Sequence, residues 1–115
     1  KSVHWEYTPP VLIGVSFGGS VVLVASAKIS DVKTVIALAP VINFREHNTG
    51  SFEEEDLSQT WQRLKTGWPH LWRVHEDHWR KLVSGTLDIN PIDYVQVLGE
   101  KNVFLIHGKK DVAVN

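Results

Sequence analysis

The chain has 115 residues, 43% of them hydrophobic, with 12 basic and 13 acidic side chains and a formal net charge of −1. This composition excludes a mainly disordered chain, and the near-neutral charge gives no general attraction to nucleic acid. The sequence has no apolar run near the roughly 20 residues of a membrane span. Neither nucleic acid nor a membrane is therefore expected as a partner. Cysteine is absent, which excludes disulfides and thiolate chemistry and fits a reducing, cytoplasmic compartment.

Apolar segments in the first third of the chain predict two strands around one helix. Residues 11–15 are rich in β-branched residues between prolines and a Gly-rich turn, which predicts a strand buried on both faces. The Val-, Leu- and Ala-rich residues 20–29 predict a buried helix. Residues 32–39 predict a second buried strand, which Pro40 ends.

The middle of the chain predicts helices. Residues 41–51 are polar and predict a loop. Beyond them, apolar residues recur every three or four positions, which is typical of an amphipathic helix. The Gly67-Trp68-Pro69 break divides this pattern into two predicted helices, residues 53–66 and 70–84.

The last third predicts one more strand. Residues 90–98 begin with Asn-Pro and predict a turn or short helix. Residues 102–106 predict a third buried strand, after which residues 109–115 form a loop. Strands that alternate with helices predict parallel βαβ units, and therefore the α/β fold class.

A Gly-Val-Ser-Phe-Gly segment between the first strand and the first helix matches the G-x-S-x-G pattern. A sharp turn there strains Ser16 and lifts its Oγ above the sheet edge. Gly14 and Gly18 must be small because their backbones approach closely, and Gly19 permits close packing of helix on strand. The Phe17 amide, at the helix N-terminus, would face a developing oxyanion. The alternative interpretation is a tight turn with an incidental serine.

A second motif follows the last strand. The sequence FLIHGKKDVAV at residues 104–114 places a His-Gly turn and an aspartate there, and Asn-Pro-Ile-Asp-Tyr at residues 90–94 precedes it. Together with GVSFGG at residues 14–19, this pattern resembles the α/β-hydrolase superfamily, most closely the prolyl oligopeptidase-like peptidases and carboxylesterases. The resemblance implies a three-layer, mostly parallel sheet, of which residues 1–115 form a partial domain, with a helical cap insertion at residues 44–86.

The resemblance also implies residue roles. Ser16 would be the nucleophile, Phe17 one oxyanion donor, and Asp111 the acid that orients a catalytic histidine. In the family this histidine follows the acid in chain order. No histidine follows Asp111, so the chain is expected to be the central segment of a longer enzyme, without its base and second oxyanion donor. His107 occupies a structural turn, and the chain order disfavours the remaining histidines as the base: His4, His47, His70, His75 and His78.

Two further side-chain clusters lie in the predicted cap. Four tryptophans could line an acyl or side-chain pocket, but packing of the cap onto the core is the favoured interpretation: Trp61, Trp68, Trp72 and Trp79. The histidines at 70, 75 and 78 lie near Glu76 and Asp77 but form no HExxH pattern. A surface or interface role is therefore favoured over a metal site, and neither a metal nor an organic cofactor is expected.

Two functional hypotheses follow. The favoured one is a serine hydrolase that cleaves a carboxylic ester or a short peptide through an acyl-enzyme on Ser16. The alternative is a non-catalytic binding or scaffold protein of the same fold, which has lost the base.

Overall fold

In the computed structural model, which describes residues 5–49, 54–71 and 73–109, three strands form a parallel sheet in the order β1-β2-β3. The strands are β1 (Val11–Val15), β2 (Thr34–Leu38) and β3 (Asn102–Ile106), and all three run toward the same edge. The predicted α/β class and parallel pairing are confirmed. The bounds of β1 and β3 agree with the sequence prediction, whereas β2 is shorter at both ends.

The strands pair without a bulge, so Val15, Leu38 and Ile106 lie side by side at the carboxyl edge. The ladder continues one residue further at two places. The Ser16 N–H donates to the Leu38 carbonyl at 2.8 Å, and the Ala39 N–H donates to the Ile106 carbonyl at 2.7 Å. These bonds fix the start of the loops that leave this edge.

Helix α1 (Phe17–Lys28) follows β1 after a single residue and packs on one face of the sheet. Its Leu23 forms the core with Val35 and Ala37 of β2. The predicted start at residue 20 was three residues late, because glycines at positions 18 and 19 have low helix propensity. At Gly19 the close packing against Pro40 and Gly14 outweighs that cost.

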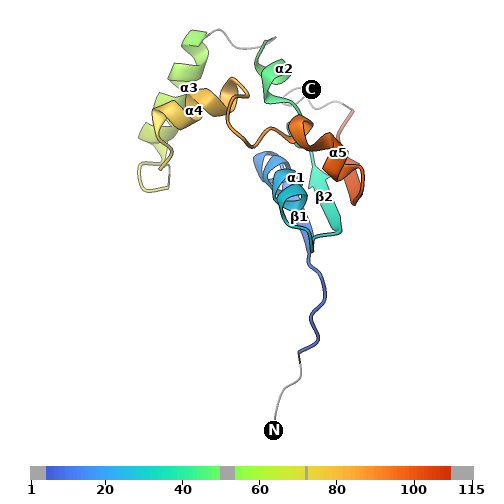
Figure 1. Ribbon diagram of the computed structural model, residues 1–115. Helices are drawn as coiled ribbons and strands as arrows, with labels where there is room; N and C mark the ends of the chain where they lie inside the picture. The colour runs from blue at the N-terminus through green and yellow to red at the C-terminus, as the bar shows by residue number, and fades with distance from the viewer. Residues whose placement is uncertain (1–4, 50–53, 72, 110–115) are drawn as a thin grey trace.

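The connection from β2 to β3 contains the remaining helices. These are α2 (Phe44–Thr49), α3 (Glu54–Gly67), α4 (Glu76–Val83), the 3-10 helix η1 (Pro91–Tyr94) and α5 (Val95–Leu98). η1 and α5 contact α1, whereas α2, α3 and α4 gather beyond the carboxyl ends of the strands (Figure 1). None of the helices in the described ranges is long and apolar enough to cross a membrane.

One loop prediction and one helix prediction were wrong. α2 forms inside the predicted loop, where Phe44 is buried despite its polar neighbours. α4 begins at Glu76 rather than at residue 70, because His75 caps it: its Nδ1 accepts a hydrogen bond from the Asp77 N–H at 3.3 Å. α3 agrees with the prediction to within a residue at each end.

The expectation that all three strands are buried on both faces was also wrong. Val35 is fully buried, but on the opposite face Ile13 is 62% exposed and Ile106 is 55% exposed. Strands added in one direction through right-handed crossovers carry their helices to the same side of the sheet. α1, η1 and α5 therefore cover one face, and within the described residues the other face of β1 and β3 is open.

Lys101 forms hydrogen bonds at the opposite edge of the sheet, where the strands begin. Its Nζ donates to the carbonyls of Ile29 at 2.9 Å and Val32 at 2.7 Å, and also to that of Ser26. The ammonium thus satisfies carbonyls at and beyond the C-terminus of α1, where a positive charge is favourable. It joins the start of β3 to the end of the helix.

A matched pair of substitutions tests the one-sided burial. In the 115-residue chain, Val35→Ala should lower the free energy of unfolding by about 1–3 kcal/mol, because it empties space in the core. Val11→Ala, at a side chain 52% exposed on the open face, should cost less than about 1 kcal/mol. Urea denaturation measures both, and equal losses would contradict the open face.

Candidate active site

Ser16 lies alone between β1 and α1 and has an unusual backbone conformation. Its φ is 54° and its ψ is −124°, in a region that residues other than glycine rarely adopt. Such a conformation costs about 1–3 kcal/mol and persists only where neighbouring structure imposes it. The side chain is exposed, and none of the described residues forms a hydrogen bond with its hydroxyl.

The neighbouring glycines explain how the turn is imposed. A Cβ at Gly14 would collide with the Gly18 carbonyl and would lie 2.8 Å from the Gly19 nitrogen. A Cβ at Gly19 would lie 3.1 Å from the Pro40 Cβ and 3.3 Å from the Gly14 carbonyl oxygen. The expected close approach of the Gly14 and Gly18 backbones is therefore present, and Gly19 lies close to Pro40 as well. The expectation that residue 18 itself must be small was wrong, because a Cβ at Gly18 meets nothing within 4 Å.

Phe17 places two groups beside Ser16. Its amide is the first of α1, and the first amides of a helix have no acceptor within the helix and carry partial positive charge. Its half-exposed ring packs edge-on against the buried Phe44 ring of α2, with ring centroids 6.3 Å apart. The site therefore has a potential oxyanion donor and an aromatic wall.

The register brings three loop positions to one row at the carboxyl edge: Ser16, Ala39 and His107 follow the paired ends of β1, β2 and β3. Ala39 shares the positive φ of Ser16, at 47°. Two strand spacings separate Ser16 from His107, about 10 Å across the sheet. The structural role expected of His107 stays a prediction. Asp111, the expected acid, lies outside the described residues.

Three of the remaining histidines lie in the α3–α4 region of the described chain and not at Ser16, whereas His4 lies outside the described residues. His70, His75 and His78 are exposed in the α3–α4 region, and His75 and His78 lie with ring centroids 6.2 Å apart. Within the described ranges no group of three metal-binding side chains lies close enough to hold an ion. His75 instead acts as the cap of α4, a role that its position before Glu76-Asp77 could have suggested.

The tryptophans separate into different environments. Trp61 is buried and donates from Nε1 to the Val74 carbonyl at 3.4 Å, so it packs α3 against the segment before α4. Trp68 is exposed and Trp79 is partly buried, whereas Trp72 lies outside the described residues. An apolar cavity of about 230 Å³ lies elsewhere, between α1, α5 and β3, and none of the tryptophans in the described ranges lines it.

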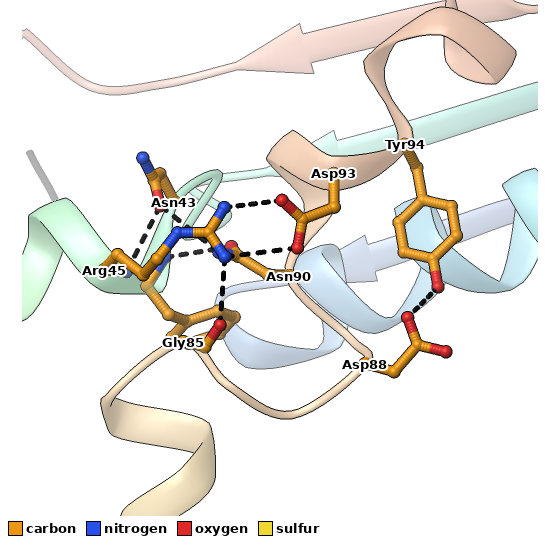
Figure 2. A network of polar contacts seen from close by, with 8 residues as sticks. Asn43, Arg45, Gly85, Asp88, Asn90, Asp93 and Tyr94 are labelled. Atoms are coloured by element: carbon orange, nitrogen blue, oxygen red, sulfur yellow. Dashed lines mark hydrogen bonds and ion pairs between the residues drawn. The ribbon is translucent and has the colours of Figure 1, made fainter.

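A polar network that sequence reasoning did not find joins the start of α2 to the 90–94 turn (Figure 2). The Arg45 guanidinium donates two hydrogen bonds to the Asp93 carboxylate, from Nη2 at 2.5 Å and from Nη1 at 3.3 Å. Nη1 also donates to the Gly85 carbonyl at 3.1 Å. Gly85 has a φ of 69°, and a Cβ there would lie 2.9 Å from the Arg45 nitrogen. Glycine is therefore required where α4 ends.

Charge pairing shifts the pKa values of this network. Hydrogen bonds from Arg45 lower the pKa of Asp93 below its ordinary value. Nearby, the Tyr94 hydroxyl donates to Asp88, and Lys28 pairs with the same carboxylate at 3.1 Å. The hydrogen bond from Tyr94, and after it the one from Lys28, lower the pKa of Asp88. The same hydrogen bond to Asp88 raises the pKa of Tyr94.

Comparisons of the chain with protein-family models, curated proteins and solved structures find no match. The chemistry of the site therefore rests on its geometry and on the sequence motifs.

The glycine geometry gives a direct stability test. Gly14→Ala should lower the free energy of unfolding by about 1–3 kcal/mol, because the new methyl group collides with the Gly18 backbone. Gly18→Ala should be neutral or stabilise by up to about 1 kcal/mol, because its methyl meets open space within a helix. Chemical denaturation checks both, and the reverse order would refute the turn geometry described here.

The Asp93 pKa predicts a pH dependence. Because the pKa is lower in the folded state, the contribution of the ion pair to stability is present above the unfolded value of about 3.9 and is lost as the pH falls below it. The unfolding midpoint of Asp93→Asn should therefore change less than that of the wild type as the pH falls below about 4. Glu100→Gln, at a side chain without an ion pair among the described residues, is the control. Parallel curves for Asp93→Asn and wild type would argue against the pairing.

Proposed function

We propose that this chain carries the nucleophile of a serine hydrolase of the α/β-hydrolase type, which cleaves a carboxylic ester or a short peptide bond. Ser16 is the nucleophile, the Phe17 amide is one oxyanion donor, and Asp111 is the acid that orients the general base. The helices α2, α3 and α4 would form the cap of this enzyme.

The observation that carries the proposal is the conformation of Ser16. Its φ of 54° occurs at a one-residue turn from a parallel strand into a helix, with the Gly14 and Gly18 backbones in close approach. A residue other than glycine keeps this costly conformation only where the surrounding structure imposes it, and such residues cluster at active sites. A strained serine at the carboxyl edge of a parallel sheet is the geometry of a nucleophile turn.

The proposed chemistry follows from these positions. The Ser16 Oγ attacks the substrate carbonyl carbon while the general base takes the hydroxyl proton. Negative charge moves to the carbonyl oxygen, where the Phe17 N–H and the N-terminal end of α1 stabilise it. The base then gives its proton to the departing alcohol or amine, which leaves an acyl-serine that water hydrolyses. In the family pattern the base is a histidine that follows the acid in chain order.

Labelling with a fluorophosphonate probe tests the nucleophile, because such probes phosphonylate activated serines. The full-length natural protein should be labelled at Ser16, and Ser16→Ala should abolish labelling. Ser30→Ala, at an exposed serine far from the carboxyl edge, should be labelled like the wild type. Mass spectrometry of the labelled peptide identifies the site.

Two outcomes would redirect the assignment. Labelling at another serine would refute the role of Ser16. A folded full-length protein without labelling would favour the alternative, a non-catalytic binding protein of the same fold.

A further inference from the structure

The Asn-Pro-Ile-Asp-Tyr turn at residues 90–94 has no role in the chemistry above, yet it contacts the segment after β2 residue by residue. The Ile92 N–H donates to the Ile42 carbonyl at 2.9 Å. The Asn90 side-chain amide forms hydrogen bonds with Asn43 and Phe44, and Asp93 forms an ion pair with Arg45. Four consecutive residues, 42–45, are thus held by one turn.

Asn90 is the buried centre of this contact, with 1% of its surface exposed. Its Oδ1 accepts from the Phe44 N–H at 3.0 Å, and its Nδ2 donates to the Asn43 Oδ1 at 3.2 Å (Figure 2). A buried amide carries a large desolvation cost unless both of its ends are bonded. Asn90 therefore fits this position in a way that an apolar residue of similar size would not.

The residue that Asn90 holds is the one that touches the candidate site. The Phe44 ring packs edge-on against the Phe17 ring, and the Phe17 amide is the proposed oxyanion donor. The Phe44 amide is the first of α2, so the bond to Asn90 also fixes where that helix begins. A continuous path of contacts runs from Asn90 through Phe44 to Phe17.

We infer that Asn90 is a positioning residue for acylation of Ser16: it fixes Phe44 against Phe17 and so fixes the oxyanion donor. This inference rests on the proposed function. It assigns to Asn90 a part in catalysis, through Phe44 and Phe17 and without contact with substrate. Displacements of about 1 Å in an active site can cost up to a hundredfold in rate, so a measurable effect is expected from a residue outside the reacting groups.

The test is the second-order rate constant of fluorophosphonate labelling, measured per folded full-length molecule after titration of the folded fraction by circular dichroism. Asn90→Leu should reduce the rate constant roughly tenfold, because the Phe44 N–H loses its acceptor. Tyr94→Phe, in the same turn but bonded to Asp88 instead, should label at the wild-type rate.

A second variant keeps the test independent of stability. In Asn90→Asp, a protonated carboxyl can still accept from Phe44 and donate to Asn43, whereas an ionised one repels the Asn43 Oδ1. The ratio of the variant rate to the wild-type rate should therefore be near one at low pH and should fall as the introduced carboxyl ionises. A purely structural role would leave this per-molecule ratio independent of pH.

Failure of the inference and failure of the proposed function give different results. Wild-type labelling at Ser16 with unchanged rates in Asn90→Leu, or a flat ratio in Asn90→Asp, overturns the inference alone. Absence of wild-type labelling overturns the proposed function and the inference with it. The NMR resonance of the Phe17 backbone amide in the 115-residue chain gives a readout that does not depend on activity. This resonance should shift in Asn90→Leu and should not shift in Tyr94→Phe. An unshifted resonance in Asn90→Leu overturns the path through Phe44.

Discussion

The contact between the Gly14 and Gly18 backbones sets how closely α1 can approach the sheet, and much of the structure depends on it. Because no side chain intervenes, the helix can begin one residue after the strand. That short connection forces Ser16 into a positive φ and directs the first amide of α1 to the carboxyl edge. The same approach brings Gly19 against Pro40, which positions the segment that leaves β2.

The segment that follows β2 is fixed by hydrogen bonds from several elements. Ser20 of α1 donates from Oγ to the Val41 carbonyl at 2.8 Å and accepts from the Val41 N–H at 3.0 Å. The 90–94 turn then holds the following residues, and Arg45 reaches back to the end of α4. The helices beyond the sheet are therefore attached through a short stretch of backbone whose polar groups are bonded from two sides.

The sequence predicts local features well and distant pairings poorly. β-branched runs between turn signals located β1 and β3, and the G-x-S-x-G pattern located the strained serine. The start of α1 was misplaced because helix propensity alone does not register the close packing of Gly19 against Pro40 and the Gly14 backbone. One-sided burial was missed because apolar residues indicate which faces need cover and not which segment covers them. The Asn90 and Arg45 contacts join residues at least 40 positions apart, and no local pattern encodes such pairs.

The strand order has a consequence for how the chain reaches this structure. Val11 pairs with Thr34, 23 positions later, whereas Thr34 pairs with Asn102 across 68 positions. The entropy of loop closure makes the second pairing about 1 kcal/mol more costly than the first, before any contact rewards it. The unit from β1 to β2 therefore has the lower barrier to nucleation, and its α1 face is available before β3 arrives. The Lys101 ammonium, which bonds the finished C-terminus of α1, can then select the register of β3 by recognising a helix that has already formed.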